Sequence, residues 1–156
     1  MHPNNSRNSM QLAGAVIGWL SVFVQFILMI SNRVASVPET VIRFFSFFTI
    51  LTNILVAFSF TSLTGMFGEK WKQFFSKATN FTAVTVYILV VGIVYNIILR
   101  WLQDFHGLQM WVDESLHLII PLYVLVYWLC FVSSPVLNGK LLLDECGIRL
   151  SIVYMF

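Results

Sequence analysis

The stretch that decides the fold is FFSFFTILTNILVAF, Phe44–Phe58, which combines five phenylalanines with a run of aliphatic residues. Such apolar content is typical of a helix that contacts lipid. The stretch nevertheless holds Ser46, Thr49, Thr52 and Asn53. The spacing i, i+3, i+7 places Ser46, Thr49 and Asn53 on one face of a helix, with Thr52 at its edge. The sequence thus predicts a membrane helix with one polar face.

The composition indicates that the bilayer is the solvent of the whole chain. Of its 156 residues, 58% are hydrophobic and 10% are charged, whereas a soluble domain has about 25% charged residues. Several apolar segments approach the ~20 residues that a helix needs to cross a membrane, and lipid offers no partners for unpaired backbone groups. We therefore predict an all-α polytopic transmembrane helical bundle with four spans. They cover Leu12–Ile30, Phe44–Phe67, Ala78–Leu99 and Leu116–Val132.

The distribution of basic residues predicts the orientation of the chain. With a cytoplasmic N-terminus, six lysines and arginines fall on the cytoplasmic side and three on the other, and EKWKQFFSK (69–77) is the most basic loop. We expect a multi-pass protein of the cell membrane with a cytoplasmic segment 1–11, a membrane domain 12–132 and a cytoplasmic tail 133–156. The net charge of +2 is too small to indicate a nucleic-acid partner.

Three predicted spans bring polar side chains to a similar depth. Thr49 lies about five residues below the outer start of its span, or ~8 Å at 1.5 Å per residue. Asn96 lies near the outer end of the third span, and His117 near the outer start of the fourth. Topology alone therefore places Thr49, Asn53, Asn96 and His117 in one leaflet. Helix-to-helix packing of small polar residues is the alternative reading.

His117 is the most chemically versatile of these side chains, because the proton affinity of histidine lies near neutrality. Asp113 and Glu114 precede it by four and three residues, so either could orient its ring. A hydroxyl, a histidine and a carboxylate form the arrangement that activates a nucleophile. The alternative is an interfacial histidine that satisfies a neighbouring helix or water. We predict no metal and no cofactor, since three or four converging ligands cannot be assembled.

Three segments together resemble a family of bacterial six-span membrane proteins of unassigned activity. They are RFFSFFTILTNILVA (43–57), VYILVVGIVYNIILR (86–100) and DESLHLIIPLYVLVYWLCF (113–131), in that order. That family is in turn remotely similar to the androgen-induced-protein-like family, whose members cleave fatty acid esters of hydroxy fatty acids. The resemblance implies a catalytic Thr49, with Thr52 as the second choice, and a catalytic His117. The family continues for two further spans, whereas residues 133–156 match nothing expected there.

These observations lead to two functional hypotheses of different class. The first is an intramembrane hydrolase of lipid-like esters, with Thr49 as nucleophile and His117 as base. Asp113 or Glu114 would orient His117, and Asn53 or Asn96 would donate to the oxyanion. The second is a non-catalytic protein: a lipid or small-molecule carrier, or a helical subunit that pairs with itself or with another membrane chain.

Overall fold

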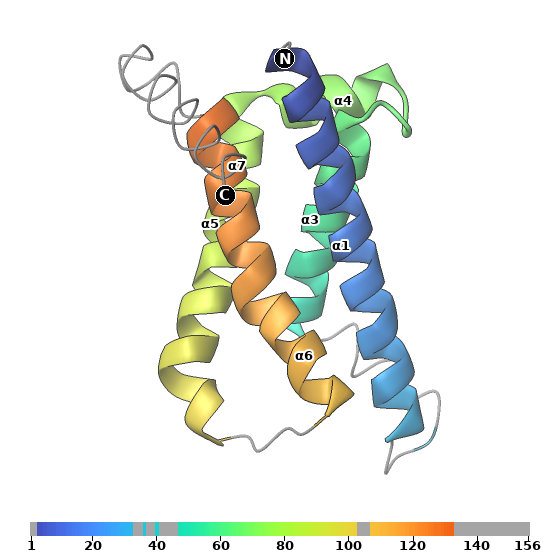
Figure 1. Ribbon diagram of the computed structural model, residues 1–156, viewed down its shortest axis with the longest axis vertical. Helices are drawn as coiled ribbons and strands as arrows, with labels where there is room; N and C mark the ends of the chain where they lie inside the picture. The colour runs from blue at the N-terminus through green and yellow to red at the C-terminus, as the bar shows by residue number, and fades with distance from the viewer. Residues whose placement is uncertain (1–2, 33–35, 37–39, 41–46, 103–106, 133–156) are drawn as a thin grey trace, which may run out of the picture.

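The computed structural model describes residues 3–32, 36, 40, 47–102 and 107–132, and nearly all of them are helical (Figure 1). The chain begins with α1 (Pro3–Ser31), continues with α3 (Phe48–Leu63) and then forms the short α4 (Glu69–Ser76). Helix α5 (Ala78–Val94) runs on into a π-helical turn, η1 (Tyr95–Leu99), and a 3₁₀ turn, η2 (Arg100–Leu102). The last long rod is built of α6 (Leu108–Glu114), a second π-helical turn η3 (Ser115–Ile119), and α7 (Ile120–Phe131). The prediction of an all-α chain is confirmed for the described residues.

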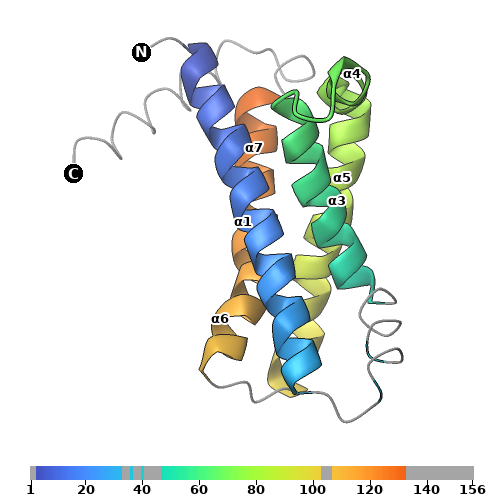
Figure 2. The same cartoon turned by 90° about the vertical axis from the view of Figure 1, so that its right-hand side faces the viewer.

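We call the four long helical segments rods: α1, α3, α5 with η1 and η2, and α6 with η3 and α7. They form a closed antiparallel ring in which α1 contacts α3, α3 contacts α5, α5 contacts α7, and α7 contacts α1 (Figures 1 and 2). Helix α4 lies at the end of this ring where α1 begins and α7 ends, and it packs on α3 and α5 (Figure 2). We call this the α4 end and the opposite one, where α6 begins, the α6 end. Sequential neighbours that run up and down through short connections are the usual topology of a four-helix bundle.

Three of these rods are long and apolar enough to cross a membrane, namely residues 5–31, 78–98 and 108–131. Only 28 to 39% of the residues in their apolar windows are buried inside the protein. The remaining apolar side chains face outward, which a protein dissolved in water would not tolerate on this scale. The fourth rod, α3, is also apolar but has 16 residues, and so spans about 24 Å at 1.5 Å per residue.

The observed helices differ from the predicted segments at several ends. Helix α3 ends at Leu63 and not at Phe67, because Gly65 and Gly68 adopt φ of +87° and turn the chain toward α4. Residues 44–46 of the predicted second span, Ser46 included, lie outside the described residues. The last rod begins at Leu108, eight residues before the predicted Leu116, so Asp113 and Glu114 are inside a helix and not before it.

Aromatic side chains fill the bundle toward the α4 end. The Phe60 ring meets Tyr127 at 5.1 Å and Phe81 at 5.6 Å, both nearly edge to face, and all three rings are buried. Such pairs contribute about 0.5–1.5 kcal/mol each beyond the area they bury. On the opposite side of Phe60, Gly14 brings α1 so close that a Cβ there would lie 2.8 Å from the ring. The polar side chains that connect Asp113 and His117 to neighbouring helices lie instead toward the α6 end.

Candidate functional site

The candidate site is built on a break in the helical hydrogen bonding around His117. Pro121 has no N–H and cannot bond to the carbonyl of His117, four residues before it. In the π-helical turn η3, the Ile120 N–H bonds to Ser115 and not to Leu116. The carbonyls of Leu116 and His117 thereby both lose the partners they would have in a regular α-helix.

Two asparagines from neighbouring helices supply hydrogen bonds to these two carbonyls. Asn53 of α3 donates from Nδ2 to the Leu116 carbonyl at 3.3 Å and to its own Thr49 carbonyl at 2.9 Å. Asn96 of η1 donates to the His117 carbonyl at 3.1 Å and to its own Gly92 carbonyl at 2.8 Å. A buried carbonyl without a partner would cost about 1–3 kcal/mol. The two amides therefore stabilise the break in the helix.

Gly92 allows α5 to come close enough for this contact. A Cβ at Gly92 would lie 3.1 Å from both the His117 carbonyl oxygen and the Pro121 Cβ. A larger side chain would push α5 away from the last rod. Asn96 lies one turn further along, and its hydrogen bond to the His117 carbonyl requires the same short distance between this helix and the last rod.

A buried carboxylate connects His117 with Tyr95. Asp113 Oδ1 lies 3.2 Å from His117 Nδ1, and the Asp113 carbonyl oxygen lies 2.9 Å from the same nitrogen. The hydroxyl of Tyr95 donates to the other carboxylate oxygen of Asp113. The Tyr95 ring is stacked on the imidazole with centroids 3.8 Å apart. Asp113 is 7% exposed, so this carboxylate is largely withdrawn from solvent and fully engaged by two partners.

An ion pair lies beside this buried group. Arg100 forms a salt bridge with Glu114 and donates to the Asn96 side-chain oxygen at 2.7 Å. Of the two acids that could have oriented the histidine, Asp113 therefore makes the contact, and Glu114 pairs with Arg100. Both Arg100 and Glu114 are more exposed than Asp113.

The predicted hydroxyl groups on α3 are in different environments. Thr52 is buried and donates to the Phe48 carbonyl at 2.8 Å, which commits its proton to its own helix. Thr49 is partly exposed and lies one turn before Asn53, on the face of α3 that meets η3. Between described residues, no hydrogen bond joins the Thr49 hydroxyl to His117.

The structure also includes residues to which the sequence assigned no role. Tyr95 and Arg100 complete the network around Asp113 and Glu114. Tyr95 directly precedes Asn96, and Arg100 follows it one turn later. Their position opposite two acidic side chains that needed partners is the sequence signal that could have identified them. A further pair, the hydroxyls of Ser21 and Ser115 at 2.7 Å, ties α1 to η3.

No metal-binding group is found in the part of the chain that the structure describes, since no three His, Cys, Asp or Glu side chains converge there. The candidate site consists of a carboxylate, an imidazole, a phenol and two amides. Its chemistry is that of proton transfer and hydrogen bonding.

Comparison of the chain with protein-family models, with curated proteins and with solved structures gives no match in any of the three. The resemblance to six-span membrane proteins therefore stays a prediction. Over its described residues, the structure shows a helical protein with three long apolar helices that can span a membrane, and one shorter apolar helix beside them.

Proposed function

We propose that this chain is a multi-span membrane protein that hydrolyses lipid-like esters, with Thr49 as nucleophile and His117 as general base. The observation that carries the proposal is the contact of Asp113 with Nδ1 of His117. Both neighbours of Nδ1 are oxygen acceptors, so the ring carries its proton on Nδ1 and offers the lone pair of Nε2. An imidazole held in this tautomer by a buried carboxylate is the arrangement of a general base.

Rigidity of the imidazole also supports this role. The Tyr95 ring is stacked on one face of His117. The Tyr95 hydroxyl donates to the Asp113 carboxylate oxygen that does not contact the imidazole. A base fixed in this way loses little conformational freedom when it accepts a proton. Pre-organisation of this kind is a large part of enzymatic rate enhancement.

In the proposed reaction the Thr49 oxygen attacks the carbonyl carbon of an ester, and its proton passes to Nε2 of His117. Collapse of the tetrahedral intermediate breaks the bond to the alcohol oxygen, which leaves with that proton. Water then attacks the acyl-threonine and gives a proton to His117. Release of the carboxylic acid returns the proton to the Thr49 oxygen.

Two features support Thr49 as the nucleophile. The Asn53 amide bonds to the Leu116 carbonyl next to His117, and the i, i+4 spacing of Thr49 and Asn53 favours a position of Thr49 on the same face of α3. The large apolar side chains beside it, Phe48 and Leu51, are exposed. They favour a substrate whose acyl chain approaches from the bilayer.

The proposal does not include the oxyanion role predicted for Asn53 and Asn96. Each amide group has two N–H bonds, and both are used on backbone carbonyls. An oxyanion donor would have to break one of these bonds. The structure supports the two asparagines as elements that hold the helix break, and not as donors to substrate.

The test is the turnover of a fluorogenic long-chain ester by the purified chain in detergent. Thr49→Ala and His117→Ala should each lower kcat by about 10²–10⁴-fold, the usual contribution of a nucleophile–base pair. The matched control is Thr79→Ala, an exposed threonine at the α4 end, which should keep the wild-type rate. Wild-type turnover in Thr49→Ala would contradict the assignment.

One observation favours the non-catalytic alternative, a lipid or small-molecule carrier or a subunit of a larger membrane assembly. Every N–H of the two amides and both carboxylate oxygens of Asp113 are already paired within the protein. In this alternative the cluster serves only to hold neighbouring helices together. In that case Asn96→Ala would disturb binding or assembly, whereas Thr49→Ala would change nothing.

A further inference from the structure

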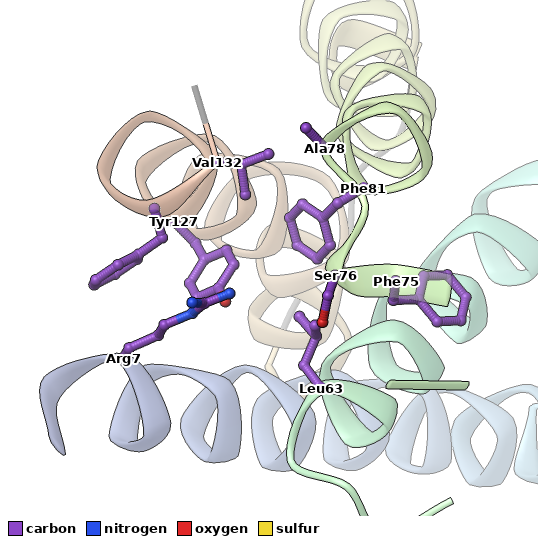
Figure 3. A pocket seen from close by; sticks show the side chains of 9 residues that line it. Arg7, Leu63, Phe75, Ser76, Ala78, Phe81, Tyr127 and Val132 are labelled. Atoms are coloured by element: carbon purple, nitrogen blue, oxygen red, sulfur yellow. The ribbon is translucent and has the colours of Figure 1, made fainter. Parts of the chain in front are cut away.

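A second feature, at the opposite end of the bundle from His117, is a cavity of about 220 Å³ that is lined by residues of all four rods and of α4 (Figure 3). Aromatic rings line it, with Phe75 from α4, Phe81 from α5 and Tyr127 from α7, and Arg7 and Ser76 add polar atoms to the lining. Sites that enclose a whole drug-sized molecule have about 300–1,000 Å³. This cavity is smaller, and is suited to a headgroup whose remainder stays outside.

The charged residue in this cavity is Arg7. Its side chain extends from α1 toward Tyr127 (Figure 3), and its Nε is buried without a hydrogen-bond partner. Among the described residues, no carboxylate forms a salt bridge with Arg7. A guanidinium whose Nε is withdrawn from solvent favours a counter-charge, because burial of an unpaired charged donor is costly. The missing partner is therefore an anion.

Tyr127 provides a second donor for such an anion. Its hydroxyl accepts a hydrogen bond from Gln11 Nε2 at 2.9 Å, which leaves its own proton free to donate. Gln11 and Tyr127 are both buried, so this hydroxyl is fixed in place. A guanidinium next to a phenolic O–H is a combination that favours phosphate, whose oxygens accept several charge-assisted hydrogen bonds.

The surroundings of the cavity point to a phosphate carried by a lipid. Helix α4, which forms one wall, exposes Trp71 and Phe74 while Phe75 is buried beneath it. Exposed aromatic residues on a short basic helix are typical of a segment that lies at the membrane interface. Lys77 adds positive charge between Ser76 and Ala78, which line the cavity, whereas Lys72 is paired with Glu69 at 3.6 Å. With the predicted cytoplasmic N-terminus, this end faces the leaflet that holds anionic lipids.

We propose that this cavity binds the phosphate headgroup of an anionic phospholipid, with Arg7 as its ion partner and Tyr127 as a hydrogen-bond donor. The acyl chains would lie outside against the apolar surface of the rods. The site is separate from the Asp113–His117 group and does not depend on the proposed hydrolase activity.

The experiment is a titration of the full chain in a non-ionic detergent with phosphatidylglycerol, followed by native mass spectrometry. Phosphatidylcholine serves as the zwitterionic comparison, and glycerol phosphate as the soluble headgroup. Arg7→Gln should weaken phosphatidylglycerol binding by about tenfold or more, as loss of a charge-assisted bond predicts. The matched control is Lys70→Gln on α4, an exposed lysine that does not line the cavity, which should bind as the wild type does.

Two variants and one competitor separate the outcomes. Tyr127→Phe should weaken binding several-fold while its thermal melting without lipid stays cooperative, and Arg7→Lys should bind between wild type and Arg7→Gln. Equal binding by wild type and Arg7→Gln would overturn the proposal, as would an equal loss in Lys70→Gln. Competition by glycerol phosphate at the same concentration as the lipid would assign the site to free phosphates and overturn the lipid assignment.

Discussion

At the scale of single residues, Asp113 is the centre of the polar cluster. One carboxylate oxygen is 3.2 Å from His117 and the other accepts from Tyr95. The sequence could predict that an acid would orient His117, because the i, i+4 spacing places both on one helical face. It could not select Asp113 over Glu114, since that choice depends on Arg100, which reaches Glu114 from another helix.

The Tyr95 hydroxyl provides the most direct test of this network. Tyr95→Phe removes one hydrogen bond from a buried carboxylate and should lower the free energy of unfolding by about 1.5–3 kcal/mol. Tyr87→Phe is the matched control, because Tyr87 is exposed on the same helix, and should change stability by less than about 0.5 kcal/mol. Equal stability of the two variants in thermal melts would show that the phenol is not engaged by Asp113.

At the scale of elements, the π-helical turn η3 explains why two asparagines reach the last rod. Pro121 and the shifted Ile120 N–H leave two carbonyls that Asn53 and Asn96 bond. Sequence reasoning predicted the shared depth of these side chains from helix direction alone. It missed their role, because the rotation of each helix and the turn itself arise from packing between rods.

This account predicts a coupling between Pro121 and Asn96. In Pro121→Ala the restored N–H can bond the His117 carbonyl. Asn96→Ala should therefore lower the free energy of unfolding by about 1 kcal/mol less in the Pro121→Ala background than in the wild type. The corresponding cycle with Asn80→Ala is the control, since Asn80 bonds Phe74 near α4, and it should be additive. An additive Pro121–Asn96 cycle would mean that the amide does not replace the missing backbone bond.

At the scale of the whole molecule, apolar surface determines the environment. Exposed Leu, Phe, Val and Ile side chains run along α1 and α5, and three rods are long enough to cross a bilayer. The lengths and apolar character of the rods were readable from the sequence, because membrane thickness fixes both. The predicted end of this span at Phe67 was too late, because the chain already turns at Gly65, whose φ is +87°.

The proposed topology of four spans with a cytoplasmic N-terminus can be measured with fusion reporters. Alkaline phosphatase fused after Gly107 should be active, because this position lies at the α6 end and faces outward in the proposal. The same reporter fused after Gly68, at the α4 end, should be inactive. Activity at both positions would mean that α3 and α5 do not cross the membrane in opposite directions.

The most direct test of the hydrolase proposal is the mass of the Thr49 peptide after the protein reacts with a long-chain ester and is quenched in acid. The proposal predicts a mass increase equal to one acyl group on Thr49 of the wild type. Thr49→Ala should show neither the adduct nor ester turnover. Continued turnover by Thr49→Ala, or an adduct on a different residue, would contradict the claim that Thr49 is the nucleophile activated by His117.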